Sequence, residues 1–341
     1  MTLSIGLIGA GANTRTQHIP GFRRQAGVEI VAVANRSIES GRRVAEEFGI
    51  PRVYATPEEL IAAPDIQAVC IGTWPYKHRE YTIMALEAGK HVLCEARMAM
   101  DLVEAEDMLA ASERHPELVA QLVPAPFDFR LGPTITRLIA EGALGEIREV
   151  TVTMLNASAL DPAVPIHWRQ RAEYSGKNVM TFGIFVEVIH RWLGDHAEVL
   201  AAGDIFVPGR MDPETGHPVP VTVPDTYVVT GQLARGARIT YHFSSVAAHA
   251  DGNGIAIFGT RGTLRWKMGD TATLIEQGRE PAALEPDPGT DRGWRVEEDF
   301  VASVLQGAPV RLTSFPDGVR YMRVIDAAHE SYRAGSARPI A

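Results

Sequence analysis

A glycine turn near the N-terminus holds the first residues whose types and spacing could do chemistry. Gly9 and Gly11 directly follow the apolar run Thr2–Ile8, which we predict to be a short strand. Gly9 permits a tight turn, and Gly11 lets a pyrophosphate approach the backbone, because a Cβ there would block it. The free N–H groups and the dipole of a following helix favour phosphate charge. The residues expected to hold the phosphates are Gly9, Gly11, Ala12, Asn13 and Thr14.

The match to a dinucleotide-binding fingerprint is incomplete, because Thr14 stands where the third glycine of G-x-G-x-x-G is expected. An ordinary βα turn is the alternative interpretation, since glycine is the default residue of tight turns. The order of the elements favours the dinucleotide. The motif follows the first strand, and a second strand, Val28–Ala34, arrives at the expected distance.

The end of the second strand indicates which dinucleotide is bound. An acidic residue there would bind the adenosine 2′-hydroxyl of NAD and repel the 2′-phosphate of NADP. Asn35 does not repel a phosphate, Arg36 can pair with it, and Ser37 can donate a hydrogen bond to it. We therefore predict that NADP(H) is favoured over NAD(H). The alternative is that these three residues only cap a helix.

The composition limits the class of protein. With 341 residues the chain is too long for one typical core, so two domains are expected. The net charge of −9 argues against a nucleic-acid surface. No apolar run is long enough to cross a bilayer, and the apolar N-terminal residues belong to the first strand, so we expect a cytoplasmic protein. Cys70 and Cys94 are interpreted as buried free thiols, and no metal-ligand spacing appears.

Strand and helix patterns alternate through residue 123. This alternation predicts an α/β fold with a Rossmann-type, doubly wound parallel sheet in a dinucleotide-binding domain, residues 1–123, whose first helix is expected over Gln17–Gln25. Residues 124–341 are expected to form an α+β domain for substrate binding and oligomerisation. A helix is expected there over Asn178–Leu193, and strands dominate from Glu198 to Glu276, which predicts a largely antiparallel open sheet.

Several motifs resemble the Gfo/Idh/MocA oxidoreductase family, which includes glucose–fructose oxidoreductase and inositol dehydrogenase. They are Gly6–Gly11 (GLIGAG), Gly72–His78 (GTWPYKH), Ala85–Glu95 (ALEAGKHVLCE), Glu141–Ile147 (EGALGEI), Trp168–Arg169 and Arg191–Gly194 (RWLG). The resemblance covers nearly the whole chain. It implies a Rossmann domain, an α/β domain with an open sheet, and a nicotinamide between them. It also implies a homodimer or homotetramer through the C-terminal sheet, and a cofactor site that includes Thr73, Trp74, Pro75, His78, Glu95 and Ala96.

The chain departs from this family at the residues that handle protons. After its Cys-Glu pair the family has Lys-Pro, and the lysine assists proton transfer at the reacting oxygen; here Ala96 and Arg97 follow. The family's Asp-x-Gly-x-His motif corresponds to Thr181–Phe185, and a further family acid corresponds to Val188. By helical spacing these positions share one face with Trp192, and that face is apolar in this chain.

Hydride transfer to or from a carbinol still needs a group that takes or gives the hydroxyl proton. Lys177, just before the predicted helix, could act as a base if it is desolvated; a solvated surface lysine is the alternative. Glu187 and His190 lie three residues apart on one helical face and could form an acid–base pair. Their alternatives are a structural hydrogen bond or a contact with Arg191.

Four more residues are expected to contact the substrate. His167 and Tyr174 could bind hydroxyl groups, with Trp168 as an apolar platform beside them. Arg97 could hold an anionic substrate group by a bidentate contact, or it could pair with a neighbouring carboxylate.

Three functions are compatible with these residues. The leading hypothesis is an NAD(P)-dependent oxidoreductase that transfers hydride at a carbinol or carbonyl carbon of a sugar, cyclitol or related polyhydroxylated compound. The second is a lyase or glycosidase-type enzyme that keeps NAD bound without net redox change. The third is a non-catalytic dinucleotide-binding sensor, which the apolar face at Thr181, Phe185 and Val188 would fit. The expected partner is a small-molecule substrate, with neither nucleic acid nor membrane.

Overall fold

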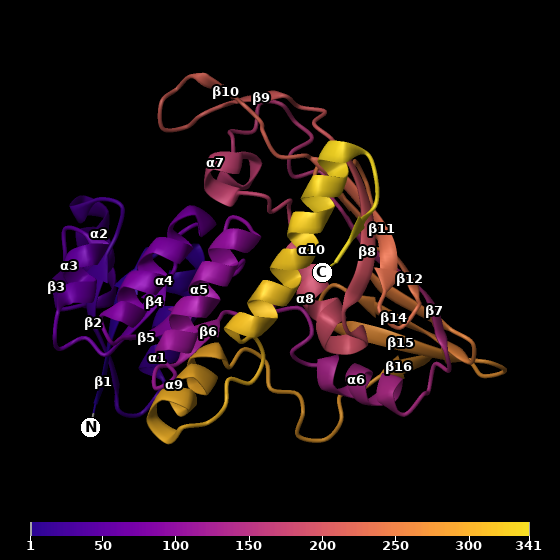
Figure 1. The fold of residues 1–341 in the computed structure, drawn as a ribbon, viewed down its shortest axis with the longest axis horizontal. Coiled ribbons are helices and arrows are strands. Elements are labelled where there is room, and N and C mark those ends of the chain that lie inside the picture. The colour runs from indigo at the N-terminus through magenta and orange to yellow at the C-terminus, as the bar shows by residue number, and fades with distance from the viewer. Residues whose placement is uncertain (1, 341) are drawn as a thin grey trace. The chain divides into compact units, whose positions relative to one another are not determined.

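The computed structural model describes residues 2–340 as two compact units (Figure 1). One unit combines Met1–Pro124 with Arg295–Val319, and the other combines Ala125–Trp294 with Arg320–Ala341. Residues 295–319 therefore belong to the first unit, although a single division of the chain at residue 123 would assign them to the second. The division into independently folding domains at residue 123 stays a prediction.

The first unit is built on a six-stranded parallel sheet with the strand order β3-β2-β1-β4-β5-β6. This order reverses direction between β1 and β4, the point where dinucleotides bind in Rossmann folds. All four residues of β4 are buried, as expected for a parallel sheet with both faces covered. The strands are β1 Leu3–Ile8, β2 Val28–Ala34, β3 Arg52–Val53, β4 Ala68–Ile71, β5 His91–Cys94 and β6 Ala120–Leu122.

Helices connect these strands, and three of them begin with a side-chain cap. Ser37, Thr56 and Asp101 each accept a hydrogen bond from the backbone N–H three residues later. The first helix, α1, packs against α9, and α4 packs against α5. The helices of this unit are α1 Ile19–Arg23, α2 Ile38–Phe48, α3 Pro57–Ala62, α4 His78–Glu87, α5 Leu102–Arg114 and α9 Val296–Gln306, with the short η2 Pro75–Lys77.

The predicted start of the first helix, at Gln17, is wrong. Helical structure begins at residue 12 and includes a π-helical turn, η1 (Thr14–His18), before α1. Within this turn the N–H of Ile19 bonds to the carbonyl of Thr14, five residues earlier. Pro20 explains the wide turn, because proline has no N–H for the carbonyl four residues back and its ring crowds that carbonyl.

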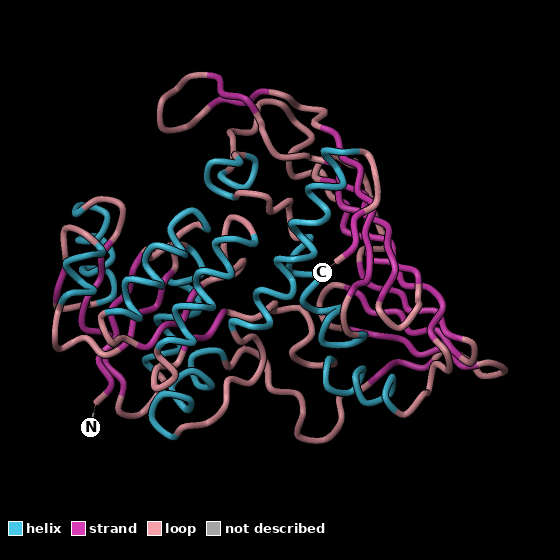
Figure 2. Tube along the Cα trace, viewed as in Figure 1, coloured by secondary structure: helices cyan, strands magenta, loops and turns pink. Residues whose placement is uncertain are grey.

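The second unit is built on a nine-stranded mixed sheet in which only β7 and β12 run parallel to each other. Figure 2 shows its long strands. The predicted fold class is thereby confirmed. The strands are β7 Ile147–Leu155, β8 His196–Asp204, β11 Thr226–Leu233, β12 Arg238–Ser244, β13 Gly254–Gly259, β14 Gly262–Lys267, β15 Thr271–Glu276, β16 Ala282–Leu284 and β17 Arg338–Pro339, with a separate hairpin of β9 Gly209–Met211 and β10 Pro218–Pro220.

Helix α8 (Phe182–Leu193) forms the core of this unit through aromatic contacts with the sheet. The ring of Phe182 meets Tyr241 edge-on, with centroids 5.1 Å apart, and Trp192 meets Trp266 in the same way at 6.2 Å. The other helices are α6 Gly132–Ala140, α7 Ala172–Ser175 and α10 Phe315–Ala334, which begins in the first unit and continues into the second, with the short η3 Trp168–Gln170.

Helix α8 begins four residues later than the predicted Asn178. Met180 has φ of +44°, a left-handed conformation that non-glycine residues rarely adopt and that an α-helix does not contain. The predicted start is therefore wrong, and Lys177 lies in an irregular segment between α7 and α8.

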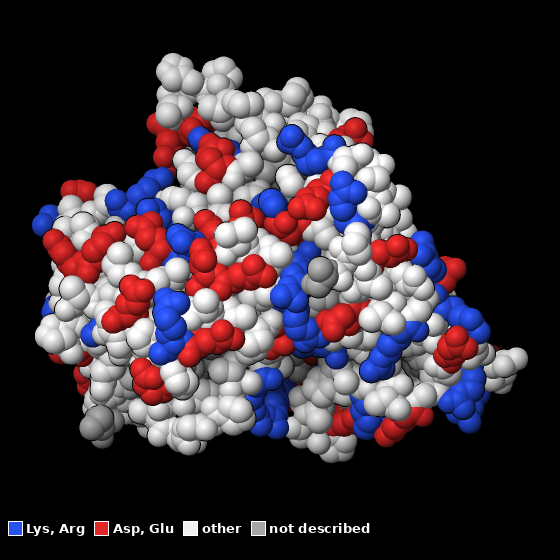
Figure 3. Space-filling model, viewed as in Figure 1, with Lys and Arg blue, Asp and Glu red and all other residues white. Residues whose placement is uncertain are grey.

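Cys70 and Cys94 are free and buried, as predicted. Within residues 2–340 no helix has both the length and the apolar character needed to span a bilayer. On the face drawn in Figure 3, Lys and Arg side chains are interspersed with Asp and Glu.

Candidate functional site

The turn after β1 brings two loops of the first unit into close contact. Gly9 has φ of +80°, and a Cβ there would lie 2.9 Å from the backbone nitrogen of Thr73. A Cβ on Gly72 would overlap Oγ1 of Thr14 and the carbonyl oxygen of Gly9. Both glycines are therefore required by the packing of the protein itself.

Gly11 differs, because the nearest atom to a Cβ built there is the carbonyl oxygen of Gly72, at 3.8 Å. The protein leaves that side of Gly11 open, as close approach of a phosphate requires. The N–H of Arg15 bonds to the carbonyl of Gly11, so the N–H groups of residues 12–14 lie at the start of the helix, where a helix has no internal partner for them. These features fit the pyrophosphate of a dinucleotide.

Thr14, at the position of the missing third glycine, is accommodated by Gly72. Its side chain is 1% exposed and its hydroxyl donates to the carbonyl of Gly9 over 3.1 Å. In the fingerprint the third glycine allows helix and strand to pack closely. Here the residue without a side chain is Gly72, on the facing loop, and Thr14 fills the space beside it.

Asn35 uses its side chain within the fold. Its Oδ1 accepts a hydrogen bond from the N–H of Ala10 over 2.7 Å, and its Nδ2 donates to Oγ of Ser40 over 3.0 Å. Ser37 caps α2, so the alternative interpretation of this segment as a helix cap holds for that residue. Arg36 is exposed beside them. Asn35 thus supports the turn that precedes the phosphate-binding residues.

The loops after β4 and β5 are joined by His78. Its ring nitrogens lie 2.9 Å from the carbonyl oxygens of Thr73 and Arg97, and its side chain is fully buried. Burial lowers the pKa of His78, although the hydrogen bonds to these carbonyl groups act in the opposite direction. Oγ1 of Thr73 is buried and has no hydrogen-bond partner within residues 2–340, which suits a contact with a bound cofactor. Pro75 follows Trp74 as the first residue of η2.

The segment after β5 holds Glu95, Ala96 and the buried Arg97. Ala96 donates its N–H to Oε2 of Glu95 over 3.1 Å, and the Ala96–Arg97 peptide bond is cis. Arg97 is 2% exposed, whereas the predicted bidentate contact with a substrate anion needs an accessible guanidinium. The Arg97 prediction therefore has no support from its position.

A buried charge cluster that sequence reasoning missed lies behind the glycine turn. His18 is fully buried, with Nε2 3.0 Å from Oε1 of Glu95 and Nδ1 2.5 Å from Oε1 of Glu297. Burial alone would lower the pKa of His18, but hydrogen bonds and charge attraction from the two carboxylates outweigh it and raise that pKa to about 9. Asn13 donates its side-chain amide to Glu95 as well. The cluster therefore reaches the start of the helix.

In the second unit, the face of α8 that carries Phe185, Val188 and Trp192 is part of the core. Phe185 and Val188 are fully buried, and the ring of Phe185 stacks on Phe127 with centroids 4.9 Å apart. Trp192 is 3% exposed on the same face. This face is therefore apolar and packed against other side chains.

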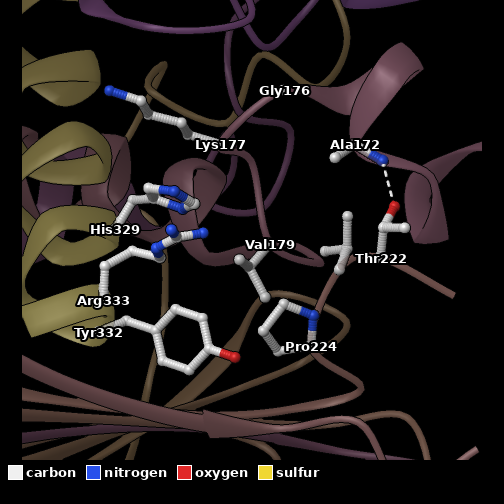
Figure 4. A pocket seen from close by; sticks show the side chains of 10 residues that line it. Ala172, Gly176, Lys177, Val179, Thr222, Pro224, His329, Tyr332 and Arg333 are labelled. Atoms are coloured by element: carbon white, nitrogen blue, oxygen red, sulfur yellow. Dashed lines mark hydrogen bonds between the residues drawn. The ribbon is translucent and has the colours of Figure 1, made fainter. Parts of the chain in front are cut away.

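Lys177 lines a pocket of about 350 Å³ in the second unit (Figure 4). Its Nζ lies 2.5 Å from Oδ1 of Asp326, and its side chain is 29% exposed. It is thus an ion-paired, half-buried lysine, which differs from both the desolvated base and the solvated surface residue that the sequence suggested. The pairing was missed because Asp326 is 149 residues away along the chain.

The last turns of α10 form one wall of this pocket. Figure 4 shows the rings of His329 and Tyr332 and the guanidinium of Arg333 there. Burial, with help from the nearby cations Lys177 and Arg333, lowers the pKa of His329. The carboxylates of Asp326 and Glu330 act on His329 in the opposite direction to these cations and raise its pKa.

Glu187 and His190 have separate hydrogen-bond partners on the two sides of α8. Glu187 accepts from Nη1 of Arg191 over 2.5 Å and from the N–H of Ala125 over 3.0 Å. His190 lies 3.1 Å from the ring of His196, nitrogen to nitrogen. The alternative in which Glu187 binds Arg191 is therefore the one observed, and Glu187 is 4% exposed.

The three aromatic residues expected at the substrate are held by neighbouring side chains or backbone. Nδ1 of His167 accepts the N–H of Arg169 as the cap of η3, and burial lowers the pKa of His167. The guanidinium of Arg169 lies over the ring of Trp168, 4.3 Å from its centroid. Tyr174 receives Arg171 in the same way at 4.7 Å. Their contact with a substrate stays a prediction.

The raised pKa of His18 predicts how stability changes with pH. The pKa is about 6.5 in the unfolded chain and about 9 when folded, so the stabilisation is complete below pH 6.5 and is lost as the pH rises through 9. The loss amounts to roughly 3 kcal/mol. Urea unfolding of the wild type and of His18→Gln should give free energies whose difference shrinks by about that amount between these pH values.

A matched control for this experiment is the exposed His242 on β12. The variant His242→Gln should follow the wild-type stability at every pH. A difference between wild type and His18→Gln that stays constant from pH 6.5 to pH 9 would contradict a protonated, ion-paired His18.

Comparison with known proteins assigns the chain to a family. A profile described as "Oxidoreductase family, NAD-binding Rossmann fold" (GFO_IDH_MocA) matches residues 3–121, and the GFO/IDH/MocA C-terminal domain matches residues 134–265. A 1,5-anhydro-D-fructose reductase from Ensifer adhaerens is 30% identical over 76% of this chain and 74% of its own length. An inositol 2-dehydrogenase from Gluconacetobacter diazotrophicus is 30% identical over 70% of this chain and 66% of its own. A solved levoglucosan dehydrogenase in complex with NADH and L-sorbose, 24% identical, shares the fold with a TM-score of 0.87 over 100% of this chain and 99% of that one. The chain therefore belongs to the Gfo/Idh/MocA family of oxidoreductases.

Proposed function

We propose that this oxidoreductase is a nicotinamide-dependent dehydrogenase or reductase that acts on a sugar, a cyclitol or a related polyhydroxylated small molecule. The observation that carries the proposal is the open helix start beside Gly11, at the point where the parallel sheet reverses its strand order. The names of relatives, an anhydrofructose reductase and an inositol dehydrogenase, support the substrate class. The pocket beside Lys177 supports it too, because its lining offers polar groups such as Thr222, His329 and Tyr332 beside the apolar Val179 and Pro224.

Residues of this chain would have distinct roles in binding and in proton transfer. When bound, a nicotinamide supplies or accepts the hydride. The N–H groups of residues 12–14 would hold the pyrophosphate, and Thr73 would offer its buried hydroxyl. In the second unit, Lys177 would take or give the hydroxyl proton while Asp326 holds its ammonium group in place.

A spectrophotometric panel tests the reaction class. The wild-type enzyme, with NADPH or NADH and a set of ketoses, inososes and anhydro sugars, should consume the reduced cofactor, and the reverse reaction should oxidise the matching alcohols. A protein that binds the cofactor but gives no change in absorbance with any member of the panel would count against a net redox function.

We also propose that NADP(H) is favoured over NAD(H). Asn35 is neutral and engaged in the turn, which leaves the exposed Arg36 beside Ser37 to meet a 2′-phosphate. The supporting argument is electrostatic, since an aspartate at the end of β2 would repel that phosphate.

The variant Asn35→Asp tests this preference. It keeps the acceptor for the N–H of Ala10 and adds one negative charge, so kcat/KM for NADPH should fall about tenfold while that for NADH changes little, a difference of ~1.4 kcal/mol. Ser40→Ala removes the other partner of Asn35 without adding charge and serves as the control. A wild-type enzyme that prefers NADH would contradict the proposal.

The role of Lys177 has its own test. Lys177→Met should lower kcat by at least ~100-fold with little change in cofactor affinity, because general acid–base catalysis contributes roughly 100- to 10,000-fold. Asp326→Asn should lower kcat less, since the ammonium group stays but loses the carboxylate that holds it in place. Full activity of Lys177→Met would remove this residue from the mechanism.

A second candidate function is a dinucleotide-binding sensor without catalysis. It is favoured by the burial of Phe185 and Val188, which occupy positions where the family has proton-handling residues. Clean turnover in the panel above would exclude it, and ligand-dependent capture of a partner protein with unchanged ligand would support it.

We further propose that the enzyme is a homodimer or homotetramer assembled through the sheet of the second unit. Alternate residues of β8 and β12 are exposed, among them Leu200 at 42%, as expected for a sheet whose second face is open. Sedimentation equilibrium with the variant Leu200→Glu tests this, because a charge in the interface should favour the monomer.

A further inference from the structure

The π-helical turn at the start of the first helix aims His18 into the core. The N–H of Ile19 bonds five residues back, to the carbonyl of Thr14, so the helix is wider here than an α-helix. Such single π turns are frequent at functional sites, because they redirect the side chains that follow. His18 closes this turn and is fully buried.

A second local feature admits the partner of His18. Gly21, on α1, has no side chain, and a Cβ built there would overlap the carboxylate of Glu297. Glu297 belongs to α9, nearly 280 positions along the chain from His18, and is 1% exposed. The absence of a side chain at Gly21 therefore lets α9 place the carboxylate of Glu297 against Nδ1 of His18.

The same cluster faces the cofactor turn through Glu95. One carboxylate oxygen of Glu95 accepts from Nε2 of His18 and from the amide of Asn13, and the other accepts the N–H of Ala96. Glu95 is 15% exposed, so it is the least buried member of the three. A carboxylate that was free at this place would be attracted to the N–H groups and the dipole of the helix start, where the pyrophosphate binds.

We infer that Glu297 and His18 are positioning residues for cofactor binding: they keep the carboxylate of Glu95 on the side chain of Asn13, so that it does not turn to the backbone N–H groups of residues 12–14. This inference rests on the proposed binding of a dinucleotide at the turn. We call the two contacts of His18, with Glu95 and with Glu297, the clamp. Loss of the clamp frees the carboxylate of Glu95, which then competes with the pyrophosphate for the N–H groups of the helix start. Glu297 and His18 thereby control cofactor affinity without touching the cofactor.

Binding of NADPH and NADH to the full-length protein, followed by isothermal titration calorimetry, tests the inference. His18→Gln should raise Kd at least tenfold, and Gly21→Ala should raise it in the same direction, because the added methyl displaces Glu297. Gly21→Ala changes no charge and places a better helix former in α1, so it stays informative if His18→Gln folds poorly. Glu298→Gln, on the same helix and ion-paired with Arg295, is the matched control and should leave Kd within twofold.

A rescue experiment distinguishes this role from a purely structural one. In the Glu95→Gln background the competing anion is absent, so adding His18→Gln should change Kd less than twofold. A tenfold loss in both backgrounds would overturn the inference, as would unchanged Kd in His18→Gln and Gly21→Ala. A wild type that binds neither NADPH nor NADH would instead overturn the proposed function.

The pH profile of binding supplies a second readout. Besides the carboxylates of Glu95 and Glu297, the titratable groups that interact with the cluster are His78 and the thiols of Cys70 and Cys94. Burial lowers the pKa of His78 and raises the pKa values of both thiols, which leaves His18 to titrate between pH 7 and pH 9.5. Between pH 7 and pH 9.5 the wild-type Kd should therefore rise as His18 loses its proton, and that of His18→Gln should stay flat. Parallel profiles for the two proteins would contradict the clamp.

Discussion

The imidazolium of His18 between two carboxylates is the interaction on which the cofactor end of the first unit depends. Burying a charge costs several kcal/mol unless it is paired and hydrogen-bonded, and His18 is both. Its partners are Glu95, which follows β5, and Glu297, on α9. The protonated ring of His18 therefore joins three segments that are far apart in sequence. The return of residues 295–319 to the first unit follows from contacts of this kind, since α9 packs on α1.

Glycines in the first unit accommodate the buried side chains that face them. Thr14 fits because Gly72 opposite has no side chain, and Glu297 reaches His18 because Gly21 leaves space. In the second unit, Phe185 stacks on Phe127 and belongs to the aromatic core around α8. Lys177, which is ion-paired with Asp326, lines a pocket there, and we therefore propose it as the group that handles the proton.

Local patterns in the sequence predicted most of the fold. Alternation of apolar strands with helices located the parallel sheet and the largely antiparallel one, because these periodicities depend only on near neighbours. The errors arose where one residue overrides the pattern. Pro20 widens the first helix into a π turn, and the left-handed Met180 delays α8. Neither effect is visible in hydrophobic periodicity.

The candidate site was less predictable, because its key contacts are long-range. The pairing of Glu187 with Arg191 is four residues apart and was among the alternatives, whereas those of His18 with Glu297 and Lys177 with Asp326 depend on the tertiary fold. Asn35 was predicted only not to repel a 2′-phosphate, and its hydrogen bond from the buried N–H of Ala10 was not foreseen, because it joins residues 25 positions apart.

Histidine-detected NMR tests the central claim most directly. In protein labelled with ¹⁵N-histidine, the resonances of His18, assigned by their loss in His18→Gln, should show a doubly protonated ring at pH 8 and titrate near pH 9. The presence of two carboxylate partners requires that result. A His18 ring that is neutral at pH 8, with a midpoint at or below 6.5, would contradict the buried ion cluster and the account built on it.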